Sequence, residues 1–225
     1  MSTAIHHPAS RLPELPAHMR RYWRGECVSF RKTSEAFGGL SNMAGGYPLL
    51  VNGRRVLTSE ALYQACRFPQ QPEIQALIIG QRSPMAAKMV GKPYRASTRP
   101  DWESVRVKVM RWALRVKLVQ NRDAFGELLE QTGSLPIVED SHRDDFWGAT
   151  PVDDDQLVGQ NILGRLLMEL REEVRREPEA LTAVLPPSLP SFLFMGEPIG
   201  PVSGVRAVDE RQSSAARRQP ALALT

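Results

Sequence analysis

The chain has 225 residues, of which 42% are hydrophobic and 24% are charged, and its formal net charge is +4. This is the composition of a globular protein, and the small positive excess favours anionic partners but falls short of a dedicated nucleic-acid-binding protein. Cys27 and Cys66 are too few for a disulfide framework, and the four histidines show no metal-ligand spacing, so neither a metal site nor a cofactor is expected.

The sequence pattern shows no export or membrane signal. The N-terminus has no continuous apolar stretch like that of a signal peptide, and nowhere do about 18 apolar residues follow one another to span a bilayer. We therefore expect a cytoplasmic protein without a membrane partner. The sequence leaves the oligomeric state open.

The N-terminal part predicts an arm followed by strands. Residues 1–22 contain scattered prolines and histidines with no sustained period, which predicts a flexible arm, and one domain is expected over residues 23–178. Residues 27–32 alternate in polarity as a strand does. Asn52 and Gly53 lie between two β-prone runs and predict a hairpin, because a type I′ turn needs positive φ at both central positions.

Helices are expected through the middle of the chain. Thr58 or Ser59 can cap the first of them, and Ser83 followed by Pro84 is typical of a helix start. The predicted elements, in chain order, are helices over 59–68, 72–79, from 83 onward, from 101 onward and over 125–131, a short strand over 135–139, and a last helix over 160–176. The helix that begins at Asp101 is the longest and carries a stripe expected to be buried, formed by Val105, Val109, Trp112, Val116 and Val119.

The C-terminal part changes character after Pro178. Repeated prolines interrupt regular structure, and residues 179–225 predict a proline-rich segment followed by a disordered tail. Residues 191–195 form an apolar exception that could fold back onto an apolar groove, but an inert linker is the favoured interpretation. Both ends of the chain are therefore expected to be dispensable for folding.

The helix over residues 59–68 carries polar groups along one side. Glu60, Tyr63, Gln64 and Arg67 are spaced i, i+3, i+4 and i+7, so they share a face, while the other side is apolar. Acid, phenol, amide and guanidinium groups on one face of an anchored helix suggest part of a binding or catalytic site. The alternative is an ordinary solvated helix face.

Five segments, taken in order, resemble the NADAR (YbiA-like) family. They are residues 38–43 (GGLSNM), 59–68 (SEALYQACRF), 102–120 (WESVRVKVMRWALRVKLVQ), the group 132–133 (TG), 138–139 (VE) and 145–148 (DFWG), and residues 159–164 (GQNILG) followed by 167–168 (LM). The resemblance spans roughly residues 27–175.

The resemblance implies a compact, mostly helical α+β single domain with a small hairpin or sheet. It also implies cleavage of N-glycosidic bonds in phosphate-bearing ribosyl compounds. The substrates attributed to the family are early riboflavin-pathway ribosylamino-pyrimidine phosphates and ADP-ribose attached to guanine in nucleic acid. The resemblance does not choose between these partners.

Glu60 is the first catalytic candidate. Loss of a base from ribose develops an oxocarbenium-like cation, which a fixed carboxylate can stabilise. A position near a helix N-terminus favours the ionised form of Glu60, which suits a base, nucleophile or cation stabiliser. Tyr63 and Gln64 beside it are expected to contact the substrate. The alternative is a simple charge at the start of a helix.

The loop over residues 145–148 supplies the next candidates. Trp147 beside Gly148 offers a flat ring face on which a base can stack. Asp145 or Glu139 is the expected second acid, which protonates or holds the leaving base. Core packing of Trp147 and simple solvation of Asp145 remain alternatives.

Phosphate binding is expected from glycine-rich turns and from one arginine. Ser41 and Asn42 follow two glycines that can expose backbone N–H groups, and Asn161 lies at the start of the last helix. Arg67 can hold a phosphate bidentately. A purely structural role for both glycine-rich turns is at least as well supported.

The chain departs from the family pattern at two positions. Members commonly carry His directly after the motif glutamate and Lys before the final Phe, whereas this chain has Ala61 and Arg67. An arginine cannot form a Schiff base, so Lys88 or Lys117 would have to replace that lysine in a covalent mechanism. These departures support an alternative, a non-catalytic module that binds NAD or ADP-ribose. A basic nucleic-acid-binding domain ranks last, because the charges surround the long helix without forming a stripe.

Overall fold

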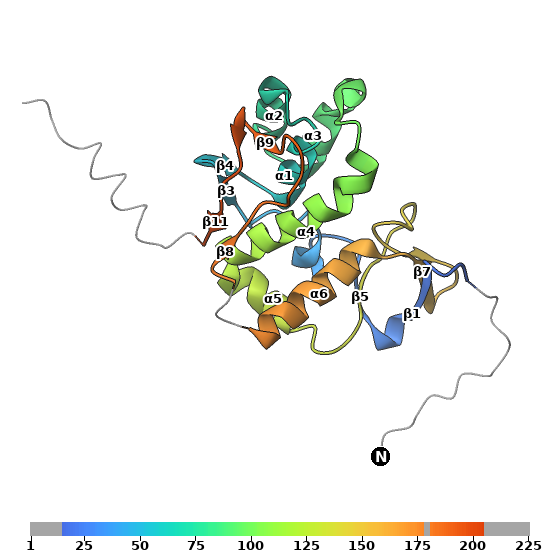
Figure 1. Ribbon diagram of the computed structural model, residues 1–225. Helices are drawn as coiled ribbons and strands as arrows, with labels where there is room; N and C mark the ends of the chain where they lie inside the picture. The colour runs from blue at the N-terminus through green and yellow to red at the C-terminus, as the bar shows by residue number, and fades with distance from the viewer. Residues whose placement is uncertain (1–14, 178–180, 205–225) are drawn as a thin grey trace, which may run out of the picture.

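The computed structural model describes residues 15–177 and 181–204, and the predicted α+β architecture is confirmed (Figure 1). The helices are α1 (Ser59–Ala65), α2 (Pro72–Ile79), α3 (Pro84–Val90), α4 (Trp102–Gln120), α5 (Glu127–Glu130) and α6 (Ile162–Arg176). The strands are β1 (Arg20–Trp23), β2 (Val28–Phe30), β3 (Leu49–Val51), β4 (Arg54–Val56), β5 (Ile137–Glu139), β6 (Thr150–Pro151), β7 (Gln156–Gly159), β8 (Ala183–Val184), β9 (Leu193–Phe194), β10 (Glu197–Pro198) and β11 (Val202–Ser203). Within the described residues, no helix has the length and apolar character needed to cross a bilayer.

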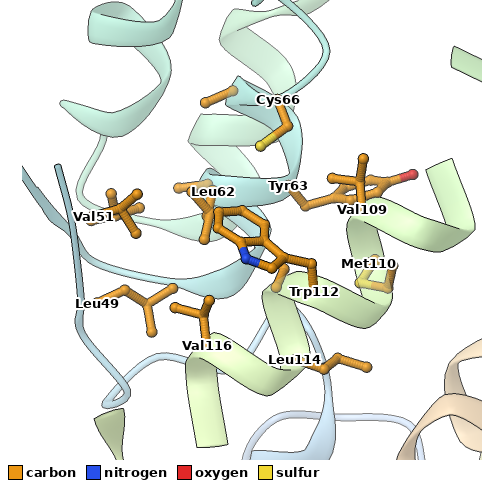
Figure 2. Packing of buried hydrophobic residues seen from close by; sticks show 14 of the residues in the cluster. Leu49, Val51, Leu62, Tyr63, Cys66, Val109, Met110, Trp112, Leu114 and Val116 are labelled. Carbon is orange, nitrogen blue, oxygen red and sulfur yellow. The ribbon is translucent and has the colours of Figure 1, made fainter. Parts of the chain in front are cut away.

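Helix α4 lies at the centre of the fold and contacts α1, α6, β3, β8 and β11 (Figure 1). All five residues of its predicted stripe are buried, so that prediction is confirmed. Figure 2 shows Trp112 of α4 beside Leu62 of α1, with Leu49 and Val51 of the β3–β4 hairpin close by. The long helix therefore joins the hairpin and α1, which carries the motif residues, into one core.

The strands form small sheets around this helical core. β1, β7 and β6 make an antiparallel sheet in that order, β2 pairs in parallel with β5, and β3–β4, β8–β11 and β9–β10 are antiparallel pairs. Asn52 and Gly53 have φ values of 46° and 69°, as the predicted hairpin turn requires. Arg20 pairs with Gly159. The ordered structure therefore begins at least three residues before Trp23, where the sequence predicted an arm, because β7 supplies a partner that no local pattern reveals.

Helix starts follow the predicted capping rules in part. The side chains of Thr58 and Ser83 accept hydrogen bonds from the N–H groups of Ala61 and Ala86, at 3.2 and 3.1 Å. Asp101 precedes α4 as predicted, but its carboxylate pairs with Arg99 instead of capping the helix. Its position still favours α4, because a negative charge near a helix N-terminus is stabilising.

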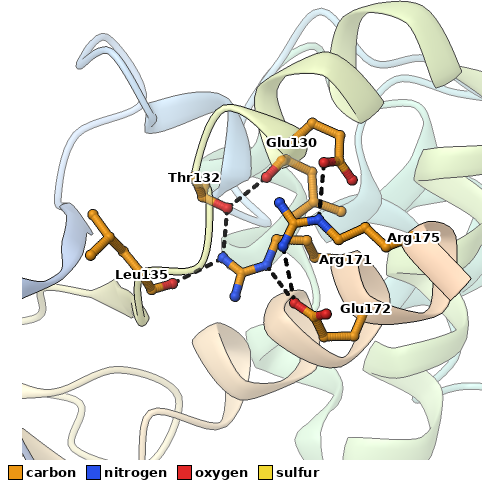
Figure 3. A network of polar contacts seen from close by, with 7 residues as sticks. Glu130, Thr132, Leu135, Arg171, Glu172 and Arg175 are labelled. Carbon is orange, nitrogen blue, oxygen red and sulfur yellow. Dashed lines mark hydrogen bonds and ion pairs between the residues drawn. The ribbon is translucent and has the colours of Figure 1, made fainter.

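A buried arginine fixes the approach to β5. Arg171 of α6 donates to the hydroxyl of Thr132 at 2.8 Å and to the carbonyl of Leu135 at 2.9 Å (Figure 3). Arg175 pairs with Glu130 and with Glu172, which also binds Arg171. This network attaches residues 130–135 to α6. It therefore fixes the position at which β5, the strand that ends at Glu139, begins.

The segment over residues 181–204 packs against the domain, and the linker interpretation of residues 191–195 was wrong. In Figure 1 it runs in red from α4 up to α1 and α2. Phe194 is fully buried, and the Phe192 ring meets Trp112 edge to face with centroids 5.4 Å apart. The side chain of Gln75 donates to the Leu193 carbonyl and accepts from the Met195 N–H. The rest of the predicted disordered tail, residues 205–225, lies outside the described residues.

Candidate active site

One cavity of about 660 Å³ opens where α1, α3, the start of α4 and the end of β5 come together. Among the predicted site residues, those that line it are Asn42, Glu60, Tyr63, Gln64, Arg67, Glu139 and Trp147. The predicted site residues absent from the lining are Ser41, Asp145, Gly148 and Asn161. The cavity is large enough to hold a nucleotide-sized ligand.

Helix α1 buries its polar face in this cavity. Glu60, Tyr63 and Gln64 are only 5%, 6% and 6% exposed, so a solvated helix face is excluded for them. The helix ends at Ala65, and Arg67 follows it in the chain but still lines the cavity. The acid, phenol and amide groups therefore face the cavity from one rigid turn.

Both oxygens of the Glu60 carboxylate are held by amides. Asn42 donates to one oxygen at 2.6 Å and Gln64 donates to the other at 2.9 Å. Burial nevertheless raises the pKa of Glu60, although these donors and the charges of Lys88 and Arg67 oppose the rise. The position at the helix start was expected to favour the ionised form, but burial is the largest influence on this pKa and acts in the opposite direction.

Glu139 provides a second carboxyl group at the end of β5. Burial raises its pKa to about 7, and the negative charges of Asp144 and Glu60 act in the same direction. Asn161 positions this strand: its side chain accepts from the Glu139 N–H at 3.2 Å and donates to the Ile137 carbonyl at 2.8 Å. Glu139 can therefore hold a proton near neutral pH, while Asn161 supports the strand from behind.

Three aromatic rings form one wall of the cavity. Tyr63 lies between Trp102 and Trp147, with ring centroids 5.0 and 5.8 Å apart. Trp147 is partly buried and also meets Phe146 edge to face at 5.1 Å. Trp102 was not among the predicted site residues, although it begins the family-like segment over residues 102–120. The rings give flat surfaces against which a base or ribose can pack.

The acidic loop uses Asp144 where the sequence predicted Asp145. Asp144 lines the cavity, and its carboxylate accepts from the N–H groups of Phe146 and Trp147 at 3.1 and 2.8 Å. Asp145 is exposed and does not line the cavity. The two neighbours cannot be told apart from the sequence, because only the loop conformation decides which one points inward.

Gly148 has a structural reason to be glycine. A Cβ there would lie 2.4 Å from the Glu139 carbonyl oxygen, so only glycine lets the loop approach β5 this closely. The Ala149 N–H donates to that carbonyl at 2.8 Å. Gly148 therefore lets the loop that carries Trp147 pack against the end of β5, without lining the cavity itself.

The two glycine-rich turns use their N–H groups internally. In residues 38–43, the N–H groups of Gly38, Leu40 and Ser41 donate to carbonyls within the same loop region. At the start of α6, the N–H groups of residues 160–163 donate to the carbonyls of residues 145–148. Ser41 is buried, and its hydroxyl accepts from the Met43 N–H. A structural role therefore fits these turns better than the predicted phosphate binding. Of Ser41 and Asn42, only Asn42 lines the cavity.

Basic side chains surround the cavity instead. Arg67 donates to Gln64 at 3.2 Å and to Thr98 at 3.4 Å, and its guanidinium carbon lies 5.4 Å from the Trp102 ring centroid. Partial burial lowers the pKa of Arg67. Further basic residues in the lining are Arg31, Lys88, Arg106, His142 and Arg143. Much of the positive charge around the cavity therefore comes from residues that were not predicted from the sequence.

Comparisons with known proteins identify the family of this chain. The NADAR domain model matches residues 29–175. N-glycosidase YbiA of Escherichia coli K12 is 34% identical over 166 residues, which cover 74% of this chain and 99% of that protein. The N-glycosidase of Nostoc punctiforme is 31% identical over 150 residues, which cover 66% of this chain and 92% of that protein.

A riboflavin biosynthesis protein of Vibrio vulnificus is 35% identical over 150 residues, covering 66% of this chain but 38% of the longer relative. The NMR structure of E. coli YbiA superposes with a TM-score of 0.58 at 35% identity, covering 69% of this chain and 89% of that chain. Sequence and fold thus point to one group of proteins, and the chain belongs to the NADAR family.

Proposed function

We propose that the chain is an N-glycosidase, a hydrolase that cleaves the bond between a ribose and a nitrogenous base. The observation that carries the proposal is the pair of carboxyl groups, Glu60 and Glu139, which share one cavity but have different surroundings. Glycosidases use such a pair, with one group protonating the leaving base and the other acting at the sugar. The relatives named N-glycosidases support the same reaction class.

In this proposal Glu60 stabilises the cation that forms as the C–N bond breaks. Its two oxygens are held by Asn42 and Gln64, so the carboxylate and its donors need not move when the oxocarbenium ion develops. The same two hydrogen bonds, with the charges of Lys88 and Arg67, oppose the effect of burial and so support the ionised form that this role requires. Glu60 thereby meets the positive charge at the anomeric carbon.

Glu139 is the proton donor in the same proposal. Its pKa of about 7 leaves a large protonated fraction at neutral pH. The proton moves to the nitrogen of the leaving base as the C–N bond breaks, and the resulting carboxylate then takes a proton from the water that attacks the anomeric carbon. The products are the free base and a ribosyl compound with a hydroxyl group, so Glu139 ends the cycle protonated.

The substrate class follows from the rest of the lining. Tyr63, Trp102 and Trp147 offer ring faces for a base or ribose, and Arg67 and Arg106 offer charge for phosphate. We propose a phosphorylated ribosyl compound, either ADP-ribosylated guanine in nucleic acid or an early riboflavin-pathway ribosylamino-pyrimidine phosphate. The relative named as a riboflavin biosynthesis protein supports the second.

The departures at Ala61 and Arg67 do not remove the carboxyl pair. Ala61 is 1% exposed and is not part of the cavity lining, so the missing histidine leaves the described cavity with both acids. Arg67 keeps a positive charge where family members have lysine. Hydrolysis through Glu60 and Glu139 needs no Schiff base, and this favours catalysis over a non-catalytic binding module.

A direct test is to incubate the purified protein with ADP-ribosylated guanosine DNA and, separately, with the phosphorylated riboflavin intermediates. Released base and phosphoribosyl product are measured by mass spectrometry, with Glu139→Gln as the low-activity control. We expect stoichiometric release from one of the two substrates. Tight binding of either compound without any release would support the binding module instead.

A further inference from the structure

Lys117 is a fully buried lysine in the middle of the domain. It lies on α4, its side chain is 0% exposed, and its ammonium donates to the carbonyls of Gly39 and Ser41 at 2.7 and 3.1 Å. The same nitrogen lies 4.3 Å from the ring centroid of Tyr47 and 4.2 Å from that of Phe125. Two carbonyl oxygens and two ring faces therefore take the place of water around the charge.

No carboxylate of the described residues compensates this charge. Burial alone lowers the pKa of Lys117 to about 7, and the titratable group that faces it is the Tyr47 phenol, whose own pKa is raised by burial. A buried ammonium is costly, and an apolar side chain of similar length would avoid that cost. The reason for a lysine at this position therefore lies in the groups that its ammonium holds in place.

What it holds is the segment that presents Asn42. The Ser41 carbonyl bound by Lys117 belongs to the peptide unit that joins Ser41 to Asn42. The Asn42 side chain donates to the Glu60 carboxylate at 2.6 Å, and the Asn42 carbonyl accepts from the Ser59 hydroxyl at 3.2 Å. One continuous set of contacts thus leads from the buried ammonium to the candidate catalytic acid.

We propose that Lys117 is a positioning residue for Glu60: its ammonium fixes the Gly39–Ser41 carbonyls so that the Asn42 amide stays on the Glu60 carboxylate. Lys117 does not line the cavity and has no exposed surface, so it does not touch the substrate. It also explains why residues 38–43 turn their carbonyls inward instead of cradling a phosphate. The inference rests on the proposed role of Glu60.

The test measures the titration of Glu60 by ¹³C NMR, with the signal assigned through Glu60→Gln, so it needs no substrate. Other charged or titratable groups that act on or respond to Glu60 are Lys88, Arg67, Glu139 and Tyr63, and all of them stay unchanged. Lys117→Met should raise the apparent pKa of Glu60 as much as Asn42→Ala does, and the double variant should give no further rise. The matched control is Val116→Ala on the same helix, which lowers the melting temperature but leaves the pKa of Glu60 unchanged.

Independent, additive effects of Lys117→Met and Asn42→Ala would overturn the proposal, as would a Glu60 titration in Lys117→Met equal to that of the wild type. If Lys117→Met does not fold, Lys117→Gln, which retains a donor, takes its place. Its effect on the pKa of Glu60 should likewise not add to that of Asn42→Ala. Once a substrate is known, Lys117→Met should lower kcat on the order of tenfold to a hundredfold with little change in KM, since slight misplacement of a reacting group has effects of this size. The NMR result stands even if the N-glycosidase activity fails.

Discussion

At the scale of single residues, the proposed chemistry depends most directly on Glu60. Both of its oxygens are occupied by amide donors, and Lys88 and Arg67 add positive charge nearby. Glu60→Gln keeps the shape of the side chain but removes the charge that opposes the developing cation. We expect a loss on the order of a hundredfold or more in kcat with an unchanged melting temperature. Glu127→Gln, an exposed glutamate on α5, is the matched control and should behave as the wild type. Activity within about threefold of the wild type in Glu60→Gln would remove Glu60 from the mechanism.

The proposed role of Glu139 predicts how kcat depends on pH. Its pKa of about 7 lies above its ordinary value of 4.5, so the proton required for the donor role is lost as the pH rises through 7. The kcat of the wild type should therefore fall on the alkaline side of about pH 7, and Glu139→Gln should have low activity without this limb. The measurement is kcat between pH 5 and 9. An unchanged alkaline limb in Glu139→Gln would assign the titration to another group.

Trp147 is expected to bind the substrate by stacking. Trp147→Ala should weaken substrate or product binding by about 1–3 kcal/mol, the usual loss for an aromatic stacking partner, as measured by isothermal titration calorimetry. Trp147→Phe keeps a ring and should recover most of the affinity. Unfolding of Trp147→Ala at room temperature would instead show that the ring serves the core.

Site residues could be predicted from the sequence where a local pattern fixes the position of the side chain. The spacing of Glu60, Tyr63 and Gln64 on one helix turn sufficed to bring them together, because a helix fixes its own geometry. Asp144 and Asp145 differ by one position in an irregular loop, and the hydrogen bonds of Asp144 to two backbone N–H groups decide between them. Lys117 and Asn161 act through contacts more than twenty residues away in sequence, which no local pattern contains.

At the scale of elements, the helices and the hairpin were predictable and the remote pairings were not. The β3–β4 turn depends on two residues with positive φ, and the starts of α1 and α3 depend on caps within three residues. The pairing of β1 with β7 joins residues that are 139 positions apart at Arg20 and Gly159. Such pairings depend on tertiary packing, so the sequence predicted an arm and a linker where the structure has strands.

The segment over residues 181–204 is expected to stabilise the domain. Phe194 is fully buried, and Phe194→Ala should reduce the free energy of unfolding by about 3–5 kcal/mol, as for other buried phenylalanines. Leu185, on the same segment, is 71% exposed, and Leu185→Ala should change stability by less than about 0.5 kcal/mol. Chemical denaturation of the two variants measures both values. Equal stability of the two would mean that the segment does not dock in solution.

At the scale of the whole molecule, the family match ends at residue 175, and further segments are packed onto it. β1 extends the sheet on one side, and residues 181–204 pack against α4 and bind Gln75 of α2 on another. Neither segment lines the cavity. They support the core behind the site, so their loss should affect stability before it affects the chemistry.

The buried Lys117 should make the stability of the whole molecule depend on pH. Its folded-state pKa of about 7 lies below its ordinary value of 10.5, so the unfolded chain binds more protons between these limits. Its contribution to stability therefore improves as the pH rises from about 7 to about 10, and Lys117→Met should lack this contribution. The stability of the wild type relative to Lys117→Met, measured by denaturation at several pH values, should increase over that range. A constant difference would show that Lys117 is solvated in solution.

The central claim is that water replaces the base at the anomeric carbon of ribose. Single-turnover hydrolysis in H₂¹⁸O, followed by mass spectrometry of both products, tests this most directly. We expect one ¹⁸O atom in the ribosyl product, none in the released base, and no label in either compound with Glu60→Gln on the same time scale. Label in the base, or tight binding of an intact substrate by the wild type, would contradict the account.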